Sequence, residues 1–375
     1  MISVVQKHVV EKDKKIDGET LLEGISLASV LPGPIAFNVV TFIGYKLRGI
    51  KGAMVSMAGI VLPSFLLMIL LSFLYLNYGD IPSFNNFFAG ILPAVAAIII
   101  SVAFTMAKKN ISDTPQILIA VISAVVIALS KAYISTLAIM LVSGIVGYLF
   151  YFNPVGVALK ATKIKEDKTE SNKFGFLIPI LLSVAFVLVF ALPYILSLEY
   201  RTTAFLHQKI ILTFSGMSLS LFGGGYVVIP AMQQVVVNSL GWLTNKEFTD
   251  AVAMGQVTPG PIFITATFIG YKVAGFWGAI NATIAIFLPP GLVMIAFSRF
   301  FDTIRNSAVI SAVFKGLRPA IIGMIAAASY TILAHSDFSL VTGLLLCVFL
   351  ILAIRYKADP VFLIPGAGII GLLIF

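Results

Sequence analysis

One segment of this chain occurs twice, which constrains the fold more than any other feature. Leu31-Pro32-Gly33-Pro34, followed by Phe-Ile-Gly-Tyr-Lys at 42–46, returns as Thr258-Pro259-Gly260-Pro261, followed by the same five residues at 268–272. Phe42 and Phe268 are 226 residues apart, and that spacing continues along both halves. It pairs Gly49 with Gly275, Pro63 with Pro289, Gly90 with Gly316, Pro93 with Pro319 and Lys131 with Lys357. Upstream of Pro-Gly-Pro the spacing is 227, so the first copy has one extra residue. Self-similarity at a fixed spacing predicts two related structural halves.

The composition indicates the environment of this duplicated chain. It is 59% hydrophobic and 11% charged, with a mean hydropathy of +1.04, whereas a soluble domain has about 25% charged residues. Apolar runs of the roughly 17 to 25 residues that cross a bilayer cover nearly the whole length. Met1 to Thr20 is polar and charged and does not resemble a cleavable signal. The sequence therefore predicts an all-α, polytopic integral membrane protein.

The apolar runs divide into spans and domains. We predict spans at 21–45 (broken at 32–34), 52–76, 84–107, 115–130 and 133–152 in the first half, and at 175–197, 203–225, 247–271 (broken at 259–261), 277–300, 308–334, 338–354 and 359–375 in the second. The predicted domains are a first transmembrane repeat at 1–152, a charged cytoplasmic linker at 153–174, an unpaired helix at 175–198 and a second transmembrane repeat at 199–375.

Loop charges predict that the two repeats have opposite orientations in the membrane. Lys and Arg are retained on the cytoplasmic side, and in the first half they follow the Pro-Gly-Pro span, as Lys46, Arg48 and Lys51, and return at Lys108 and Lys109. In the second half, Arg299 and Arg305 lie in the loop whose first-half counterpart has no Lys or Arg. One unpaired span at 175–198 would cause this exchange of sides. Inverted repeats are typical of secondary transporters.

The repeat spacing also indicates that the first copy lacks an opening helix. The second copy has a span near 203–222 and the run Gly223-Gly224-Gly225 before its Pro-Gly-Pro, and the first-copy counterparts would have numbers below 1. We expect Met1 to be an internal methionine, with one helix of about 20 to 25 residues preceding it. A naturally asymmetric transporter is the alternative.

The two Pro-Gly-Pro segments are the strongest candidates for a binding site. Proline lacks an amide hydrogen and disfavours helix at the residue before it, so each segment should break its span and start a new helix. Such a helix start presents unpaired amides and a partial positive charge, which bind anions. Non-helical backbone at membrane depth is tolerated where it is buried in protein or lines a cavity. Paired breaks at matching positions therefore predict a substrate-binding site.

Polar side chains and a glycine run lie near both breaks. The candidate substrate-binding residues offer backbone amides, hydroxyls, side-chain amides or one guanidinium; they are Pro32, Gly33, Pro34, Asn38, Thr41, Gly223, Gly224, Gly225, Gln256, Thr258, Pro259, Gly260, Pro261, Thr265 and Arg318. Ser29 and Thr267 are further hydroxyl donors nearby. Arg318 qualifies because an intramembrane arginine is by default functional, although it can also extend to the membrane surface. The alternative reading of the small and glycine residues is close helix packing.

Other motifs give no support for a metal, a nucleotide cofactor or catalysis. Gly366-Ala367-Gly368-Ile369-Ile370-Gly371 has dinucleotide-binding spacing but lies in an apolar helical segment without a preceding strand. The three histidines and Cys347 show no metal-ligand spacing. The spans contain no evident nucleophile, base or carboxylate pair. We therefore expect a protein that is not an enzyme and needs no cofactor.

The motifs resemble those of the chromate ion transporter family. The resemblance covers both halves and rests on 222–226 (Phe-Gly-Gly-Gly-Tyr), 241–244 (Gly-Trp-Leu-Thr), 256–261 and the Phe-Ile-Gly-Tyr-Lys that follows each Pro-Gly-Pro. It implies an inner-membrane protein of two oppositely oriented halves that exports chromate and confers resistance to it. It also implies that the glycine run and both Pro-Gly-Pro segments are functional motifs. Its implied partners are chromate or a sulfate-like oxyanion and the lipid bilayer, not nucleic acid; small-residue helix faces would also allow a homodimer. Transport of another oxyanion such as sulfate and a nontransporting membrane scaffold or fragment are the alternatives.

Overall fold

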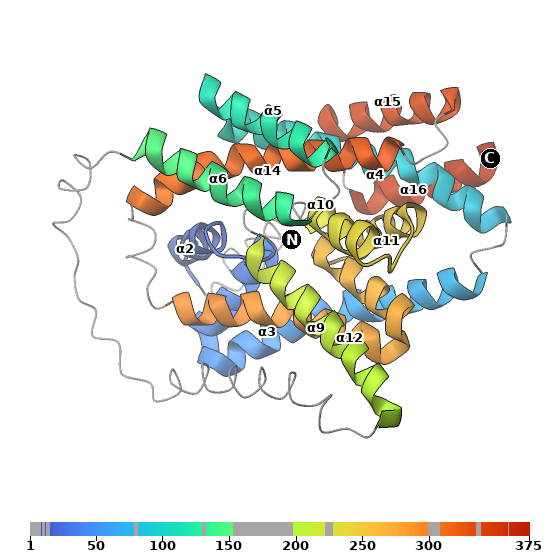
Figure 1. Cartoon of the computed structure of the whole chain (residues 1–375), viewed down its shortest axis with the longest axis horizontal. Helices are drawn as coiled ribbons and strands as arrows, with labels where there is room; N and C mark the ends of the chain where they lie inside the picture. Colours follow the sequence, from blue (N-terminus) through green and yellow to red (C-terminus); the bar gives the residue numbers. More distant parts are fainter. Residues whose placement is uncertain are drawn as a thin grey trace.

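In the computed structural model of the chain, the secondary-structure elements of the described residues are all helices (Figure 1). These are residues 9, 12, 16–78, 82–129, 133–152, 198–221, 228–298, 308–334, 339–358 and 360–375. The predicted linker at 153–174, the predicted unpaired helix at 175–197 and the glycine run at 223–225 lie outside them. The prediction of an all-α polytopic fold is confirmed.

Helices of the two halves correspond one to one under the repeat spacing. The first half contains α2 (Gly18–Ala28), α3 (Ile35–Tyr78), α4 (Pro82–Asn110), α5 (Thr114–Leu129) and α6 (Tyr133–Tyr151). Their counterparts are α11 (Asn245–Val257), α12 (Thr265–Phe297), α14 (Ala308–Ala334), α15 (Leu340–Ile354) and α16 (Pro360–Ile374). The second half also contains α9 (Leu198–Ser220), α10 (Val228–Gln233) and the π-helix η4 (Gln234–Ser239). Sequence analysis predicted no span at 228–239; the structure forms α10 and η4 there, and most of this stretch is buried.

Each half begins with a capped helix that leads to its Pro-Gly-Pro. Asp17 caps α2, accepting a hydrogen bond from the Thr20 N–H at 2.8 Å. Hydrogen bonding to Thr20 holds the Asp17 pKa below its usual value. Thr244, the repeat counterpart of Asp17, caps α11 in a capping box with Glu247. The two caps therefore fix equivalent helix starts with different side chains.

The long helices α3 and α12 both reverse direction at a matching glycine. The kinks lie at Arg48-Gly49 in α3 and at Ala274-Gly275 in α12, and both glycines have positive φ, 58° and 62°. After the reversal the two limbs of each helix touch, because glycines on either side of the kink bring the backbones together: Gly44 lies against Gly52, and Gly270 against Gly278. Each long helix is therefore a helical hairpin, which agrees with the separate spans predicted before and after 46–51.

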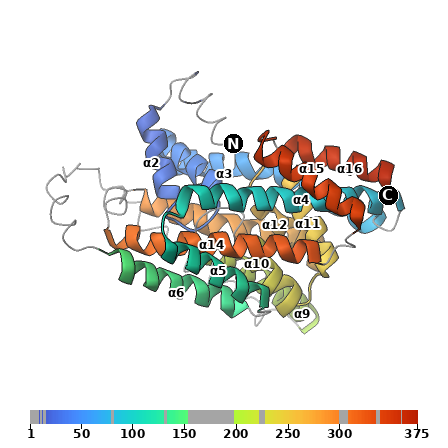
Figure 2. The same ribbon diagram turned by 90° about the horizontal axis from the view of Figure 1, so that it is seen from above.

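The two halves interlock through their longest central helices. α4 packs against α15 and α16 of the second half, and α14 packs against α5 and α6 of the first. Glycine pairs allow the closest approaches, with Gly90 of α4 against Gly371, and Gly316 of α14 against Gly147. The counterparts α4 and α14 pack together and run in opposite directions, as Figures 1 and 2 both show.

The surface and the helix lengths fit a bilayer. Four of the described helical segments are long and apolar enough to cross a membrane: Ile35–Tyr78, Asn85–Asn110, Ile262–Phe297 and Ala308–Tyr330. Large apolar side chains are exposed along the outer helices, including Leu141 on α6 at 69% and Leu344 on α15 at 60%. Soluble monomers rarely expose apolar surface on this scale. The chain is a multi-pass membrane protein.

Candidate functional site

The first Pro-Gly-Pro break forms hydrogen bonds with α3, which follows it, and with Leu221 of the second half. α2 ends at Ala28 and α3 begins at Ile35. The Asn38 amide nitrogen donates to Pro32 O at 2.9 Å, and the Gly33 N–H donates to Leu221 O at 3.1 Å. Gly33 has a φ of 100°, a conformation that L side chains rarely adopt. The break is therefore a fixed turn, and Leu221, which follows α9, lies against it.

The second break has a different local structure at the matching position. α11 ends at Val257, and a 3₁₀ turn at Ile262–Ile264 precedes α12. The Gly260 N–H donates to Thr258 O at 2.8 Å, and the Ile264 N–H donates to Pro261 O at 3.0 Å. The first copy has one more residue between its Pro-Gly-Pro and Phe-Ile-Gly-Tyr-Lys, and its α-helix begins directly after Pro34. Both spans are thus interrupted at Pro-Gly-Pro, as the sequence predicts.

Each break packs against the long hairpin of the other half. The Cα of Gly33 lies against the ring of Pro290 on α12, and the Cα of Gly260 lies against Ser64 on α3. Pro290 and Ser64 are counterparts under the repeat spacing, as Gly33 and Gly260 are. The contact is therefore reciprocal, which is the arrangement expected of two copies related by a pseudo-two-fold axis.

Aromatic side chains bring the two breaks together. Phe37 and Phe263 are counterparts that directly follow the two breaks. Both pack on Phe287 of α12, with ring centroids 5.2 Å and 6.4 Å away. All three rings are buried. The two halves therefore present their helix starts to one shared region around Phe287.

The helix starts provide backbone amides near that region. In α3 the Asn38 N–H donates to Pro34 O at 2.9 Å, so the amides of residues 35–37 precede the first intrahelical bond. In the second half the amides of 262 and 263 hold the same position before the bond from Ile264. The glycine amides of both breaks are bonded to carbonyls. The Pro-Gly-Pro segments thus shape the chain, and the residues after them supply the donors.

Most of the predicted hydroxyl donors bond within the protein. Thr41 donates to Phe37 O at 2.8 Å, Thr258 to Gly255 O at 2.8 Å and Thr265 to Ile262 O at 2.8 Å. Ser29 donates to Ser26 O at 2.7 Å, and Thr267 bonds to Thr283 at 2.7 Å. The first four bond a backbone carbonyl of the preceding turn, as threonine and serine often do, and Thr267 bonds a side chain. These hydroxyls would have to rotate away from the backbone to donate to an anion.

Ser64 is a hydroxyl that sequence reasoning missed. Its side chain is fully buried, and its Oγ has no hydrogen-bond partner among the described residues. It lies against Gly260 of the second break. Asn38 Oδ1, at the first break, is also buried without a partner. A sequence signal was present, because the repeat pairs Pro63 with Pro289 and then replaces Pro290 by Ser64.

The remaining candidate residues differ in burial and in their contacts. Gln256 is buried in the last turn of α11. Arg318 is exposed on α14, and its guanidinium lies 6.0 Å from the ring of Phe314 on the same helix. Lys46 and Lys272, which recur in both copies, form ion pairs with Glu23 and Glu247 at 3.6 Å and 2.8 Å. Gly223, Gly224 and Gly225 lie outside the described residues.

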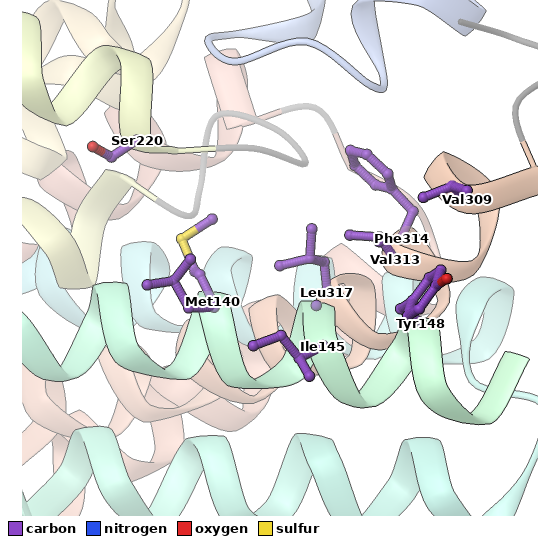
Figure 3. Close-up of a pocket in the computed structure, with 10 residues that line it drawn as sticks. Met140, Ile145, Tyr148, Ser220, Val309, Val313, Phe314 and Leu317 are labelled. Carbon is purple, nitrogen blue, oxygen red and sulfur yellow. The ribbon is translucent and has the colours of Figure 1, made fainter. Parts of the chain in front are cut away.

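A pocket between α6, α9 and α14 is unsuited to an anion. It has a volume of about 760 Å³, and Met140, Ile145, Phe314 and Leu317 line it (Figure 3). Nearly all of its lining is apolar. A charged group placed there without hydrogen bonds would have a large desolvation cost. The region of the two breaks, with its amides and buried Ser64, is the candidate anion site.

The described residues contain no cluster that suits a metal ion. No group of three histidine, cysteine, aspartate or glutamate side chains comes together within them. The candidate site consists of amide, hydroxyl and aromatic groups. Amide and hydroxyl groups can bind an anion through hydrogen bonds.

Comparison with known proteins identifies relatives along nearly the whole chain. An uncharacterised transporter of Methanocaldococcus jannaschii is 28% identical over 95% of this chain and 85% of its own. The chromate transport protein of Cupriavidus metallidurans is 29% identical over 99% of this chain and 87% of its own. A probable chromate transport protein of Synechococcus elongatus is 30% identical over 88% of this chain and 78% of its own. No solved structure is significantly similar to the chain.

The family comparison covers both halves of the helical fold. The chromate transporter family model matches residues 1–148 and 208–372, which include both Pro-Gly-Pro breaks and the helices that pack on them. These matches are far more than half of the chain. The chain is a membrane transporter that belongs to the chromate transporter family.

Proposed function

We propose that this chain exports chromate across the bacterial inner membrane and thereby confers resistance to it. Family membership supports the transport of an oxyanion, and two of the relatives are named as actual or probable chromate transport proteins. The observation that carries the proposal is the meeting of the two breaks around Phe287, with the buried, unpartnered Ser64 hydroxyl at Gly260.

The chemistry of this region suits a tetrahedral dianion. Chromate has four oxygens that accept hydrogen bonds in different directions. Helix-start amides from both halves and the Ser64 hydroxyl supply donors without a fixed positive charge. A site without fixed charge binds the dianion weakly enough to release it on the other side. Sulfate has the same shape and charge, so the same donors would also form hydrogen bonds to it.

The fold suggests how such a site becomes accessible from alternate sides. The repeat counterparts α4 and α14 run in opposite directions, and each break packs on the hairpin of the other half. In transporters with inverted repeats the two copies rock against each other about a site at the midplane. A membrane potential that is negative inside favours export by about 2.3 kcal/mol per charge per 100 mV, or about 4.6 kcal/mol for a dianion.

Flux measurements on the purified full chain in lipid vesicles test the proposal. Chromate would be loaded inside, a potential negative inside would be set with a potassium gradient, and chromate appearing outside would be followed by its absorbance. We expect flux that increases with the potential and saturates as the chromate concentration is raised. If the protein carries no chromate but releases radiolabelled sulfate, chromate is not the substrate and a sulfate-like anion is.

Two serines on α3 provide a matched pair of variants. Ser64→Ala removes the unpartnered hydroxyl, and Ser72→Ala removes a buried hydroxyl that donates to Met68 O at 2.6 Å. A hydrogen bond to a charged group contributes about 1.5–3 kcal/mol, so Ser64→Ala should raise the KM for chromate by roughly 10- to 100-fold. Ser72→Ala should leave it nearly unchanged. Equal changes in the KM for chromate in both variants would show that Ser64 does not bind the anion.

A further inference from the structure

A buried carboxyl group lies on α11, the helix that ends at the second break. Asp250 on α11 is 1% exposed. Its Oδ2 accepts a hydrogen bond from the Tyr75 hydroxyl of α3 at 2.7 Å. Its Oδ1 is buried and has no hydrogen-bond partner among the described residues. If Asp250 is ionised, its two buried oxygens share a negative charge, and among the described residues only the neutral Tyr75 hydroxyl donates a hydrogen bond to them.

The repeat shows how Asp250 came to lack a basic partner. Its first-half counterpart Glu23 forms an ion pair with Lys46 at 3.6 Å. Lys272 is the counterpart of Lys46, but it pairs with Glu247 at 2.8 Å, one helical turn before Asp250. The counterpart of Glu247 is the neutral Thr20. The second copy thus has one more acid, which pairs with the lysine, and Asp250 bonds to a tyrosine instead.

The other elements around Asp250 do not replace that lysine. The charged groups that act on it are Lys246 and Glu247 of its own helix, which have opposite effects on its charge. Lys246 Nζ donates to Asn85 Oδ1 of α4 at 3.0 Å, so it is directed to another helix. α10 and α16, which also pack on α11, contain no titratable residue. α3 presents Tyr75, and Lys272 of α12 is held by Glu247.

An isolated, buried carboxylate is costly, and it is neutralised most simply by a proton. We propose that Asp250 is a proton-binding site and that its protonation is coupled to anion transport, an inference that rests on the proposed function. The proton binds at Oδ1 while Tyr75 continues to donate to Oδ2. It comes from water on one side of the membrane and returns to water on the other, so no further reactant is needed.

The position of Asp250 links its charge to the candidate site. It lies eight residues before Thr258 at the second break, about 12 Å along α11. Its partner Tyr75 lies on the same limb of α3 as Ser64, and the Tyr75 ring packs against Phe268 of α12 at 5.3 Å. A carboxylate at this distance repels a dianion at the breaks, and protonation removes the repulsion. Proton and anion therefore bind together and cross in the same direction, which reduces the charge moved per cycle from two to one.

Infrared spectroscopy tests proton binding without any transport. The full chain in lipid would be titrated while the carbonyl stretch of protonated carboxyl groups is recorded, and the spectrum of Asp250→Asn would be subtracted. The asparagine keeps an oxygen for the Tyr75 hydrogen bond, so the fold should persist. We expect a titrating band present in the wild type and in Glu23→Gln but absent from Asp250→Asn. Identical titrating bands in wild type and Asp250→Asn would overturn the proposal.

A pH gradient across vesicles tests the coupling. With one proton moved per anion, a difference of one pH unit shifts the steady-state chromate ratio about tenfold, because each tenfold ratio corresponds to about 1.4 kcal/mol. We expect wild type and Glu23→Gln to accumulate chromate on the alkaline side, and Asp250→Asn to show no shift. A full tenfold shift in Asp250→Asn, or accumulation on the acidic side, would overturn it. Absence of chromate flux from every variant, with the infrared band intact, would instead contradict the proposed function.

Discussion

The hydroxyls of Thr267 and Thr283 are 2.7 Å apart although sixteen residues separate them within α12. In a straight helix those residues would lie about 24 Å apart. Thr283 donates to Ala279 O at 2.7 Å, so Thr267 is the donor of the bond between them. The bond joins the two limbs of the α12 hairpin next to the second break. The reversal at Gly275 therefore places residues of the site-forming limb against its return limb.

Replacing Gly275 with alanine should destabilise this hairpin. Gly275 has φ 62° and ψ −155°, a region used almost only by glycine, where a side chain costs about 1–3 kcal/mol. No atom lies within 4 Å of the position that the alanine methyl group would take, so the cost comes from the backbone and not from a collision. Thermal unfolding of the purified protein should show a lower Tm for Gly275→Ala, and for Gly49→Ala, whose φ and ψ are 58° and −147°.

Gly216→Ala is the control for these two variants. Gly216 lies within helix α9 and also has open space around it. Alanine favours a helix interior by about 1 kcal/mol over glycine, so this variant should unfold at an equal or higher temperature. Equal Tm losses at positions 216 and 275 would contradict the role given to the hairpin reversal.

Much of this architecture follows from the sequence because the repeat and the apolar runs are strong signals. Most predicted spans match the described helices within about five residues, and both Pro-Gly-Pro segments interrupt them; the predicted span at 175–197 lies outside the described residues. The stretch at 228–239 was not predicted, because it is too short to span a membrane and its burial depends on tertiary packing. The packing of α4 on α16, and of α14 on α6, was also not predicted, because the hydrophobic pattern of a helix does not specify which helix packs against it.

The sequence predicted where the two helix breaks lie, but not the contacts that their side chains make. The sequence indicates where the chain breaks, because proline and glycine act locally. It does not show that Thr41, Thr258 and Thr265 bond to their own helices, nor that Ser64 lies opposite Gly260. These contacts depend on rotamers and on residues from the other half. The repeat alignment did show one relevant difference, because Ser64 stands where the second copy has Pro290.

Close packing of the halves predicts a strong effect at Gly316. A methyl group there would collide with the backbone of Ser143 and Gly147 on α6, and backbone atoms cannot turn aside as a side chain can. Overpacking of this kind costs about 1–3 kcal/mol, so Gly316→Ala should lower the Tm. Gly366→Ala on α16, where the space is open, should not. A stable Gly316→Ala variant would show that the interface between α14 and α6 is looser than this contact implies.

The cap of α2 should make stability depend on acid pH. Hydrogen bonding to Thr20 lowers the Asp17 pKa in the folded protein, so the ionised cap stabilises the fold above the unfolded pKa of about 3.9. That contribution is lost as the pH falls through the lower, folded pKa. Asp17→Ser keeps a cap that does not titrate. The Tm advantage of wild type over Asp17→Ser should therefore shrink as the pH falls below about 4; a constant difference would exclude this linkage.

The reciprocal contacts of the two breaks allow a test by compensation. Gly260 is not among the residues of positive φ, so alanine is permitted by the backbone and its methyl group collides only with Ser64. Gly260→Ala should lower the Tm, and adding Ser64→Gly should restore part of it, although glycine in a helix itself costs about 0.5–1 kcal/mol. A double-mutant cycle should give a favourable coupling of about 0.5–3 kcal/mol, as expected for residues in contact. Gly33→Ala should not be rescued by changing Pro290, because a φ of 100° strains any side chain there. Strictly additive effects of Gly260→Ala and Ser64→Gly would mean that the second break does not rest on α3.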